Sequence, residues 1–164
     1  MVIIAFSSTP DEFNENIEFL KFISDPVVLI APPNHPWAAR GEIEVEELRK
    51  APLILREASA GTYRVARLGL ANLGVNIESL RVILTMGNSE SISIAVQQGL
   101  GVGFVSRMVV KRIQPGSVAV VQIRGLELSQ DIFICQHRLH PMLRVQTAFW
   151  DFATNPENPI LKNL

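Results

Sequence analysis

The sequence predicts an α/β fold arranged in two lobes, because apolar runs typical of strands alternate with helical segments along its 164 residues. The stretch from Met86 to Arg107 carries the clearest pattern: a strand end, a polar turn, a short helix, a glycine stop and a second strand. This order is half of a parallel β-α-β crossover. With 48% hydrophobic and 19% charged residues, the chain can form a sizeable core, and its composition argues against disorder.

Apolar runs rich in valine, isoleucine and leucine predict strands. In chain order they cover residues 1–6, 26–31, 53–55, 82–84, 102–105, 118–123 and 132–135. The run 102–105 suits a strand that is buried on both faces. Residues 17–23 alternate apolar and polar side chains and predict an edge strand.

Helices are predicted where apolar residues recur at helical spacing. The expected apolar stripes consist of Ala66, Leu70 and Leu73; of Ile92, Ala95, Val96 and Gly99; and of Val145, Phe149 and Phe152. Gly74 is expected to end the first helix, and Gly99 with Gly101 the second, because glycine takes a left-handed conformation without a Cβ penalty. Residues 106–112 predict a shorter helix.

The order of these elements predicts two lobes. Residues 32–123 contain a self-sufficient β-α-β-α-β set, whereas residues 1–31 and 124–164 are two pieces of a second lobe. Strands near Val27–Ala31 and Val118–Ile123 are expected to link the lobes. This layout is typical of a two-lobed binding protein with a cleft and a double hinge.

Composition and motifs exclude several classes of function. The net charge of −1, without a run of basic residues, argues against nucleic-acid binding by this chain. No window approaches the roughly 20 apolar residues of a membrane span. Residues 1–6 lack the basic start of a signal peptide, so a cytoplasmic location is expected. No Ser-His-Asp triad, paired-carboxylate motif or phosphate loop is present, so the sequence predicts neither an enzyme nor a cofactor.

A metal site is also not expected. The single cysteine, Cys135, lies in an apolar run and predicts a buried thiol, and it cannot form an internal disulfide. His137 and His140 lie nearby, but no second cluster supplies the four ligands of a structural zinc site.

Seven residues that follow predicted strands are candidates for ligand binding: Ser7, Ser59, Gly61, Thr62, Gly87, Asn88 and Ser89. Most of them lie where two strands lead into helices. Hydroxyl groups and free N–H groups at two helix N-termini suit a carboxylate, a sulfate or a similar anion. The sequence therefore predicts an anion site at the carboxyl ends of these strands.

Each candidate also has a purely structural explanation. Helix capping alone accounts for the serine, threonine and asparagine residues at the helix starts. Ser7 is the weakest candidate, because it is more readily explained as a solvated loop serine. Gly61 and Gly87 allow close backbone approach to a ligand, but tight turns alone also require glycine.

Four stretches in this order resemble the effector-binding domain of LysR-type transcriptional regulators: PVVLIAPPNHPWA, LILREASAGTYRVARLGLANLG, MGNSESISIAVQQGLGVGFVSR and ELSQDIFICQHR with the last helix. Each stretch alone is a common α/β turn, whereas their order and spacing together are specific. The resemblance extends from Met1 to about Ala153.

The resemblance implies two Rossmann-like lobes of the type 2 periplasmic-binding-protein class. Residues 1–31 with 124–164 would form lobe one, and residues 32–123 would form lobe two. A small anionic metabolite would bind in the cleft between the lobes and act through the geometry of a homodimer or tetramer. Promoter DNA would be bound only by an N-terminal winged helix-turn-helix, which this chain lacks. The first part of lobe one would precede Met1, so the N-terminal lobe is expected to be incomplete.

Two alternatives share the predicted fold. One is a stand-alone solute-binding protein, which the missing export signal disfavours. The other is a small cytoplasmic enzyme, such as a ligase or dehydratase, which turnover of a small acid would reveal.

Overall fold

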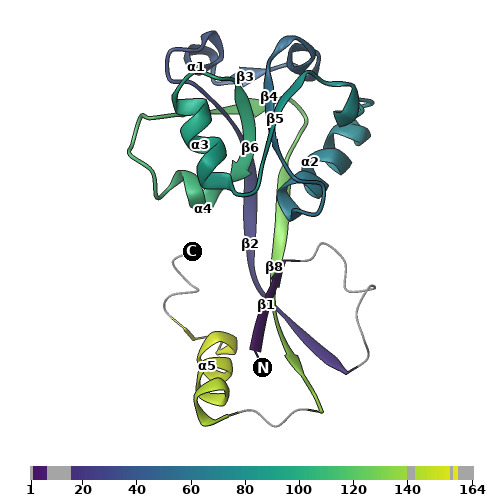
Figure 1. The fold of residues 1–164 in the computed structure, drawn as a ribbon, viewed down its shortest axis with the longest axis vertical. Helices are drawn as coiled ribbons and strands as arrows, with labels where there is room; N and C mark the ends of the chain where they lie inside the picture. The colour runs from purple at the N-terminus through teal and green to yellow at the C-terminus, as the bar shows by residue number, and fades with distance from the viewer. Residues whose placement is uncertain (1, 7–15, 140–142, 156, 159–164) are drawn as a thin grey trace. The chain divides into compact units, whose positions relative to one another are not determined.

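The computed structural model describes residues 2–6, 16–139, 143–155 and 157–158. The chain forms two compact units: unit 1 is Met1–Ser24 with Asp131–Leu164, and unit 2 is Asp25–Gln130. The strands, labelled in Figure 1, are β1 (Val2–Phe6), β2 (Ile17–Ala31), β3 (Glu42–Ile43), β4 (Leu53–Arg56), β5 (Val82–Met86), β6 (Val102–Ser106), β7 (Ala119–Ile123) and β8 (Leu128–His137). The helices are α1 (Pro36–Arg40), α2 (Gly61–Asn72), α3 (Ser89–Gln97), α4 (Arg107–Val110) and α5 (Arg144–Thr154), with 3₁₀ turns at Val45–Lys50 and Ile77–Ser79.

Every run predicted to be a strand forms one. The predicted strands 17–23 and 26–31 are joined into the single strand β2, which continues through Pro26. The fixed φ of proline, near −65°, is compatible with extended backbone, so Pro26 removes a donor without ending the strand.

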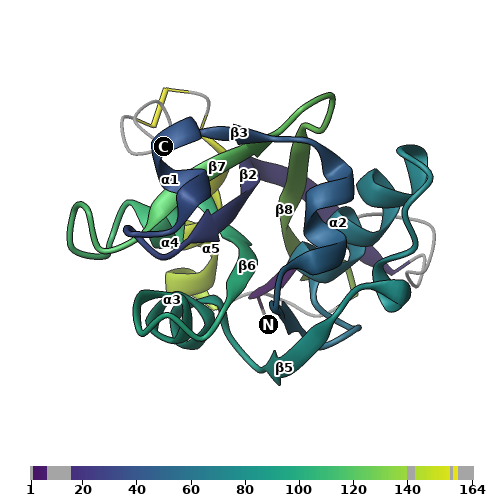
Figure 2. The same cartoon turned by 90° about the horizontal axis from the view of Figure 1, so that it is seen from above.

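Unit 2 contains a mixed sheet in the order β2-β6-β4-β5. Strand β4 is parallel to β5 and β6, and β2 is antiparallel to β6. Helix α2 connects β4 to β5 and helix α3 connects β5 to β6, which confirms the predicted β-α-β-α-β order. The two helices cover opposite faces of the sheet, as Figure 2 shows.

Each face of this sheet has its own hydrophobic cluster, because alternate strand residues point to opposite sides. The α2 cluster includes Leu53, Leu55, Ala66, Leu70 and Phe104. The α3 cluster consists of Ile30, Ile54, Ile92, Ala95, Val96 and Val105. Most residues of the two predicted stripes are buried as expected, but Leu73 is only half-buried, and Gly99 lies beyond the end of α3 and is exposed. Strand β6 is buried along its whole length.

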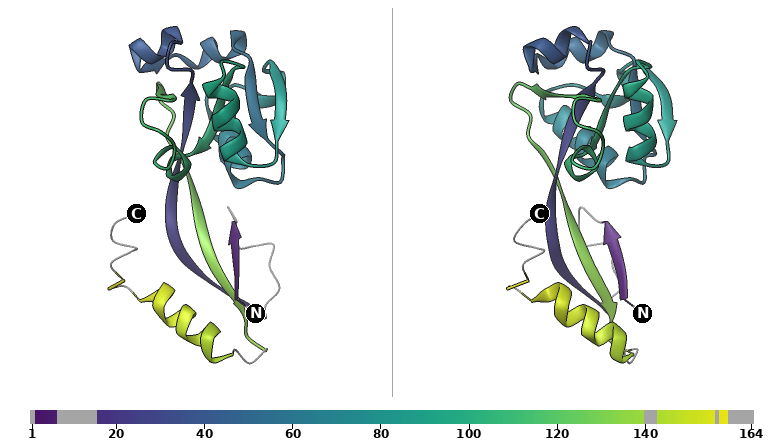
Figure 3. Two further views of the ribbon diagram at one scale, coloured as in Figure 1. Left: turned by 60° about the vertical axis from the view of Figure 1, so that its left-hand side comes forward. Right: turned by 90° about the vertical axis from the view of Figure 1, so that its left-hand side faces the viewer.

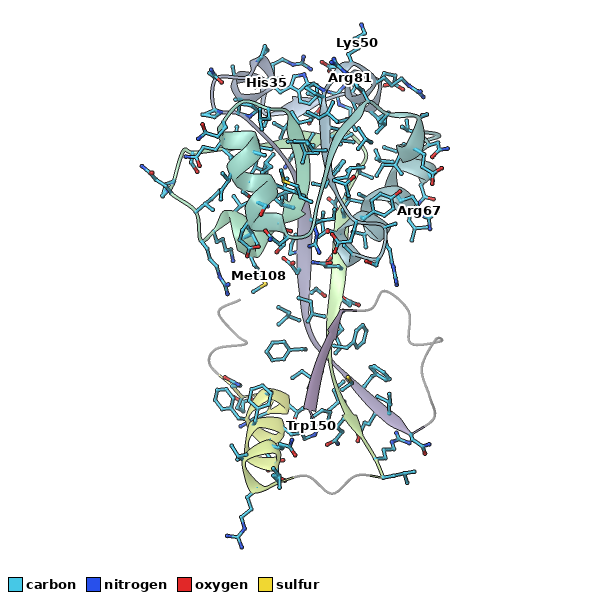
Figure 4. The ribbon with its side chains drawn as sticks, in the orientation of Figure 1. His35, Lys50, Arg67, Arg81, Met108 and Trp150 are labelled. Atoms are coloured by element: carbon cyan, nitrogen blue, oxygen red, sulfur yellow. The ribbon has the colours of Figure 1, made fainter. Side chains whose placement is uncertain are left out.

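Unit 1 combines strands from both ends of the chain with α5. Strand β1 is antiparallel to β8, and α5 lies beside the strands of this unit in both views of Figure 3. Trp150 and Ala153 are the buried residues of α5, and Trp150, labelled in Figure 4, packs with Ile134 and Phe22.

The predicted apolar side of the last helix was wrong. Val145, Phe149 and Phe152 are exposed, and the adjacent side with Trp150 and Ala153 faces the strands instead. Apolar residues lie around more than half of the circumference of this helix, so their periodicity alone could not identify the buried side.

The chain passes between the units within β2, after Ser24, and within β8, after Gln130. The second passage was expected near Val118–Ile123, but that run forms β7, which pairs with β2 inside unit 2. The lobe boundaries drawn from the sequence stay a prediction. Among the described residues, no helix is long and apolar enough to cross a membrane.

Candidate functional site

Apart from Ser7, the candidate residues lie around the starts of α2 and α3, at the carboxyl edge of the sheet of unit 2. Arg56 at the end of β4 pairs with Met86 at the end of β5, so the loops that follow both strands start side by side. One loop leads to α2 and the other to α3. Because these helices lie on opposite faces, their N-termini share an edge but approach it from different sides.

The N-terminus of α3 is capped by its own sequence. Asn88 is the N-cap, and its Oδ1 accepts a hydrogen bond of 2.7 Å from the backbone N–H of Ser91. Ser89 is buried, and its carbonyl oxygen accepts from the Ser93 hydroxyl at 3.0 Å. The Oδ1 of Asn88 therefore has a capping role, as the structural explanation predicted.

The N-terminus of α2 is different, because no side chain caps it. The N-cap is Ala60, which has no polar side chain, rather than Ser59. Thr62 is only 4% exposed, and its Oγ1 has no hydrogen-bond partner. Within the described part of the chain, the N–H groups of Gly61, Thr62 and Tyr63 also find no acceptor. This helix end therefore retains the free donors and positive dipole that favour an anion.

A buried polar cluster adjoins the start of α2. A Cβ on Gly61 would lie 2.6 Å from Oε1 of Gln130, so this amide would have to shift to make room for a side chain there. The Nε2 of Gln130 donates a hydrogen bond of 2.9 Å to Oδ2 of Asp25. Both side chains are more than nine-tenths buried, and Oδ1 of Asp25 has no partner. The Gln130 amide thus lies between the Asp25 carboxylate and the first residue of α2.

Charged groups of both signs lie at this edge, including the carboxylate of Glu90 in the first turn of α3. Arg107 follows β6, is exposed, and forms no salt bridge with any described residue. Arg56 is paired with Glu57 at 2.7 Å, and this hydrogen-bonded guanidinium lowers the pKa of Glu57 to about 2. Lys50 and Arg81 lie at the opposite end of unit 2, away from the candidate residues (Figure 4).

For Ser59 and Gly87, the structure shows no contact or backbone conformation that requires the residue type. Ser59 is exposed. A Cβ on Gly87 would meet nothing within 4 Å, and its φ is not positive, so neither space nor conformation requires glycine there. Ser7 lies outside the described residues, as does His140. The binding role of all seven residues stays a prediction. No group of three or more metal-ligating side chains occurs among the described residues.

Asp25 and Gln130 were not predicted from the sequence. The signal for Asp25 is a charged residue directly before the apolar run 26–31, where a loop would be expected. Gln130 gives no comparable signal, because a glutamine at a strand start is ordinary and its partner is 105 residues away.

Unit 2 also has an open groove of about 910 Å³ beside β7. Its lining includes Pro26–Leu29, Phe104, Arg107 and residues 120–129. Pro26 and Ser129, the sequence neighbours of Asp25 and Gln130, line this groove, but none of the predicted site residues does.

A sheet in which β4, β5 and β6 are parallel, with a helix on each face and polar helix starts at its carboxyl edge, is typical of α/β ligand-binding proteins. The chain belongs to the LysR substrate binding domain family, whose sequence model matches residues 4–155.

Related sequences are transcriptional regulators. An uncharacterized HTH-type transcriptional regulator of Methanocaldococcus jannaschii is 30% identical over 142 residues, which cover 86% of this chain and 48% of that protein. A probable RuBisCO transcriptional regulator of Cyanophora paradoxa is 30% identical over 126 residues, 76% of this chain and 39% of that protein. The chain therefore spans about half the length, or less, of the curated relatives it matches.

Solved structures with the same fold are regulatory domains. The regulatory domain of CcmR from Synechocystis PCC6803, in complex with 2-PG, has a TM-score of 0.79 at 21% identity; the match covers 99% of this chain and 74% of that one. The effector binding domain of QuiR in complex with shikimate has a TM-score of 0.74 at 17% identity and covers 93% and 69%. These likenesses confirm the predicted fold class, the two-lobed α/β architecture of LysR effector-binding domains.

Proposed function

We propose that this chain is the effector-binding domain of a LysR-type transcriptional regulator, and that the N-terminus of α2 binds an anionic group of its small-molecule effector. Family membership supports the regulatory role. In the proposed mechanism, a ligand that binds one arrangement of the domain better than another shifts the population of dimer geometries. A DNA-binding domain outside this chain would read that shift.

One observation carries the proposed site: α2 lacks a cap, while Thr62 Oγ1 beside its free N–H groups is buried without a partner. Helix ends and buried hydroxyls are normally satisfied, so two unmet groups together indicate a ligand. The capped α3 in the same unit supplies the contrast. The exposed Arg107 at the same edge also favours an anion. The ligands named in the CcmR and QuiR structures support a small molecule.

A thermal-shift screen with small carboxylates, amino-acid precursors, sulfate and phosphate tests the proposal. A ligand at 100 times its Kd should raise stability by about 2.7 kcal/mol. Stabilisation that rises with dose is expected for one anionic class, and no shift with any anion would contradict the anion site. Turnover of a small acid would instead favour the enzyme alternative.

We expect Thr62→Val to weaken binding of the anion found in this screen by about 1–3 kcal/mol, because the ligand loses a buried hydrogen-bond partner. Valine has nearly the same shape, so the domain should remain folded. Isothermal titration calorimetry gives the affinity, and circular dichroism verifies the fold. Thr147→Val, at an exposed threonine in the first turns of α5, is the matched control and should leave affinity unchanged. Equal affinity of the Thr62 variant and the wild type would refute the site.

We further propose that β5 and α3 form a homodimer face. Strand β5 ends the sheet of unit 2, and its Val82, Ile83 and Leu84 are exposed. Ile94 on α3 is 59% exposed. An apolar edge strand next to an apolar helix surface favours burial against a second copy.

Ile94→Glu should shift the chain from dimer to monomer in sedimentation velocity, because a charge would be buried at the contact. Leu68→Glu is the matched control: Leu68 is a similarly exposed residue on α2, outside the proposed face. A monomeric wild type, or equal effects of both substitutions, would contradict this interface.

A further inference from the structure

Two buried oxygen atoms without partners lie beside the same helix end. They are Oδ1 of Asp25 and Oγ1 of Thr62, on residues that are 1% and 4% exposed. A buried acceptor without a donor costs free energy, and most such atoms in folded proteins are satisfied. Their occurrence in one cluster indicates that this cluster has a binding partner.

The cluster holds the carboxylate of Asp25 from one side only. Gln130 donates to Oδ2 at 2.9 Å, and the backbone oxygen of Asp25 accepts from the Ser129 hydroxyl at 3.5 Å. No described group donates to Oδ1. The Nε2 of Gln130 donates to Oδ2, and its Oε1 lies next to Gly61 at the start of α2.

The two parts of the cluster require opposite chemistry from a ligand. The free N–H groups of α2 bind an acceptor, and the helix dipole favours one with negative charge. The Oδ1 of Asp25 lacks a hydrogen-bond donor, and a simple anion carries none to offer it. One side-chain amide separates the two parts, so both groups of the ligand must lie within a few bonds of each other.

We propose that the effector is a small organic acid that carries a hydrogen-bond donor, a hydroxyl or an ammonium, close to its anionic group. The anion lies at the N-terminus of α2, and the donor meets Oδ1 of Asp25. Asp25 is therefore a specificity-determining residue, which selects against acids without a donor. This inference rests on the proposed function of the α2 site.

Succinate, malate and aspartate form a matched set of probes, because they differ only in having no donor, a hydroxyl or an ammonium at one carbon. Calorimetric titration of the wild-type chain should show malate or aspartate binding at least tenfold more tightly than succinate, about the effect of one hydrogen bond to a charged group. The comparison of malate with aspartate identifies the donor.

Asp25→Asn should reduce this preference to about twofold or less, because the amide places a donor where the ligand donor was accepted. Glu127→Gln is the matched control: it removes an exposed carboxylate in the turn before β8 and should keep the preference. Circular dichroism verifies that both variants fold, and the wild-type comparison decides the inference even if Asp25→Asn does not fold.

Equal affinities of the wild type for the three acids would overturn the inference but leave the anion site standing. An unchanged preference in folded Asp25→Asn would also overturn it. If none of the three binds, the inference fails, and the screen with sulfate and phosphate then shows whether the anion site fails with it.

Discussion

Ile54→Ala is expected to lower the free energy of unfolding of unit 2 by about 2–5 kcal/mol, the usual cost of removing a large side chain from a core. Ile54 is fully buried in β4, the strand between β5 and β6. It packs against Ile92 and Val96 of α3 and Val105 of β6. The α3 cluster has few members, so the remaining side chains cannot close the cavity.

The two tryptophans make this measurement specific for one unit. Trp37 lies in unit 2 and Trp150 in unit 1, and both are buried. In a Trp150→Phe background, urea unfolding followed by tryptophan fluorescence therefore reports on unit 2. Leu68→Ala is the matched control, because Leu68 is an apolar residue of unit 2 that is 51% exposed on α2, outside the proposed dimer face. Its loss should be below about 1 kcal/mol, and equal losses would contradict the assigned core.

Local signals made the centre of unit 2 predictable from the sequence. Strand β6 is a short apolar run that directly follows Gly101, and the stripes of α2 and α3 follow helical spacing. Gly74 and Gly99 have φ values of 73° and 78°, so the predicted helix ends depend on glycine for the expected reason. Each of these features is decided within a few residues of sequence.

The features that were missed depend on contacts between distant residues. The hydrogen bond from Gln130 to Asp25 joins residues 105 positions apart, so no local sequence pattern could predict it. The buried side of α5 was mispredicted because packing against Ile134 and Phe22, rather than hydrophobicity alone, selects Trp150.

The candidate site, too, was predictable only in the features that neighbouring residues decide. Composition indicated two helix starts at one sheet edge, which the strand pairing confirms. It could not show that only one start is capped, because Ser59 and Asn88 are equally good caps by residue type. The difference comes from position: the chain enters α2 one residue after Ser59, at Ala60, whereas it enters α3 at Asn88 itself.

Gly103→Ala is expected to destabilise unit 2 by about 2–3 kcal/mol through overpacking. A Cβ at this position of β6 would lie 2.6 Å from Cγ2 of Ile92 and 2.9 Å from the backbone oxygen of Ile54. Ile92 belongs to α3, so the helix must move away from the sheet, and the backbone of β4 cannot easily yield. Gly87→Ala is the control, since a Cβ there meets nothing within 4 Å.

A double-mutant cycle separates the two contacts. Ile92→Ala removes Cγ2, so in the Gly103→Ala background it should relieve the contact with α3 but not the contact with Ile54. The two substitutions together should therefore cost less than the sum of their single effects, by at least about 1 kcal/mol. Additive losses would mean that the strain falls on the β4 backbone alone. Because Asn88 caps the same helix, relief by Ile92→Ala would also show that Gly103 sets the distance at which α3, and with it this edge of the candidate site, lies from the sheet.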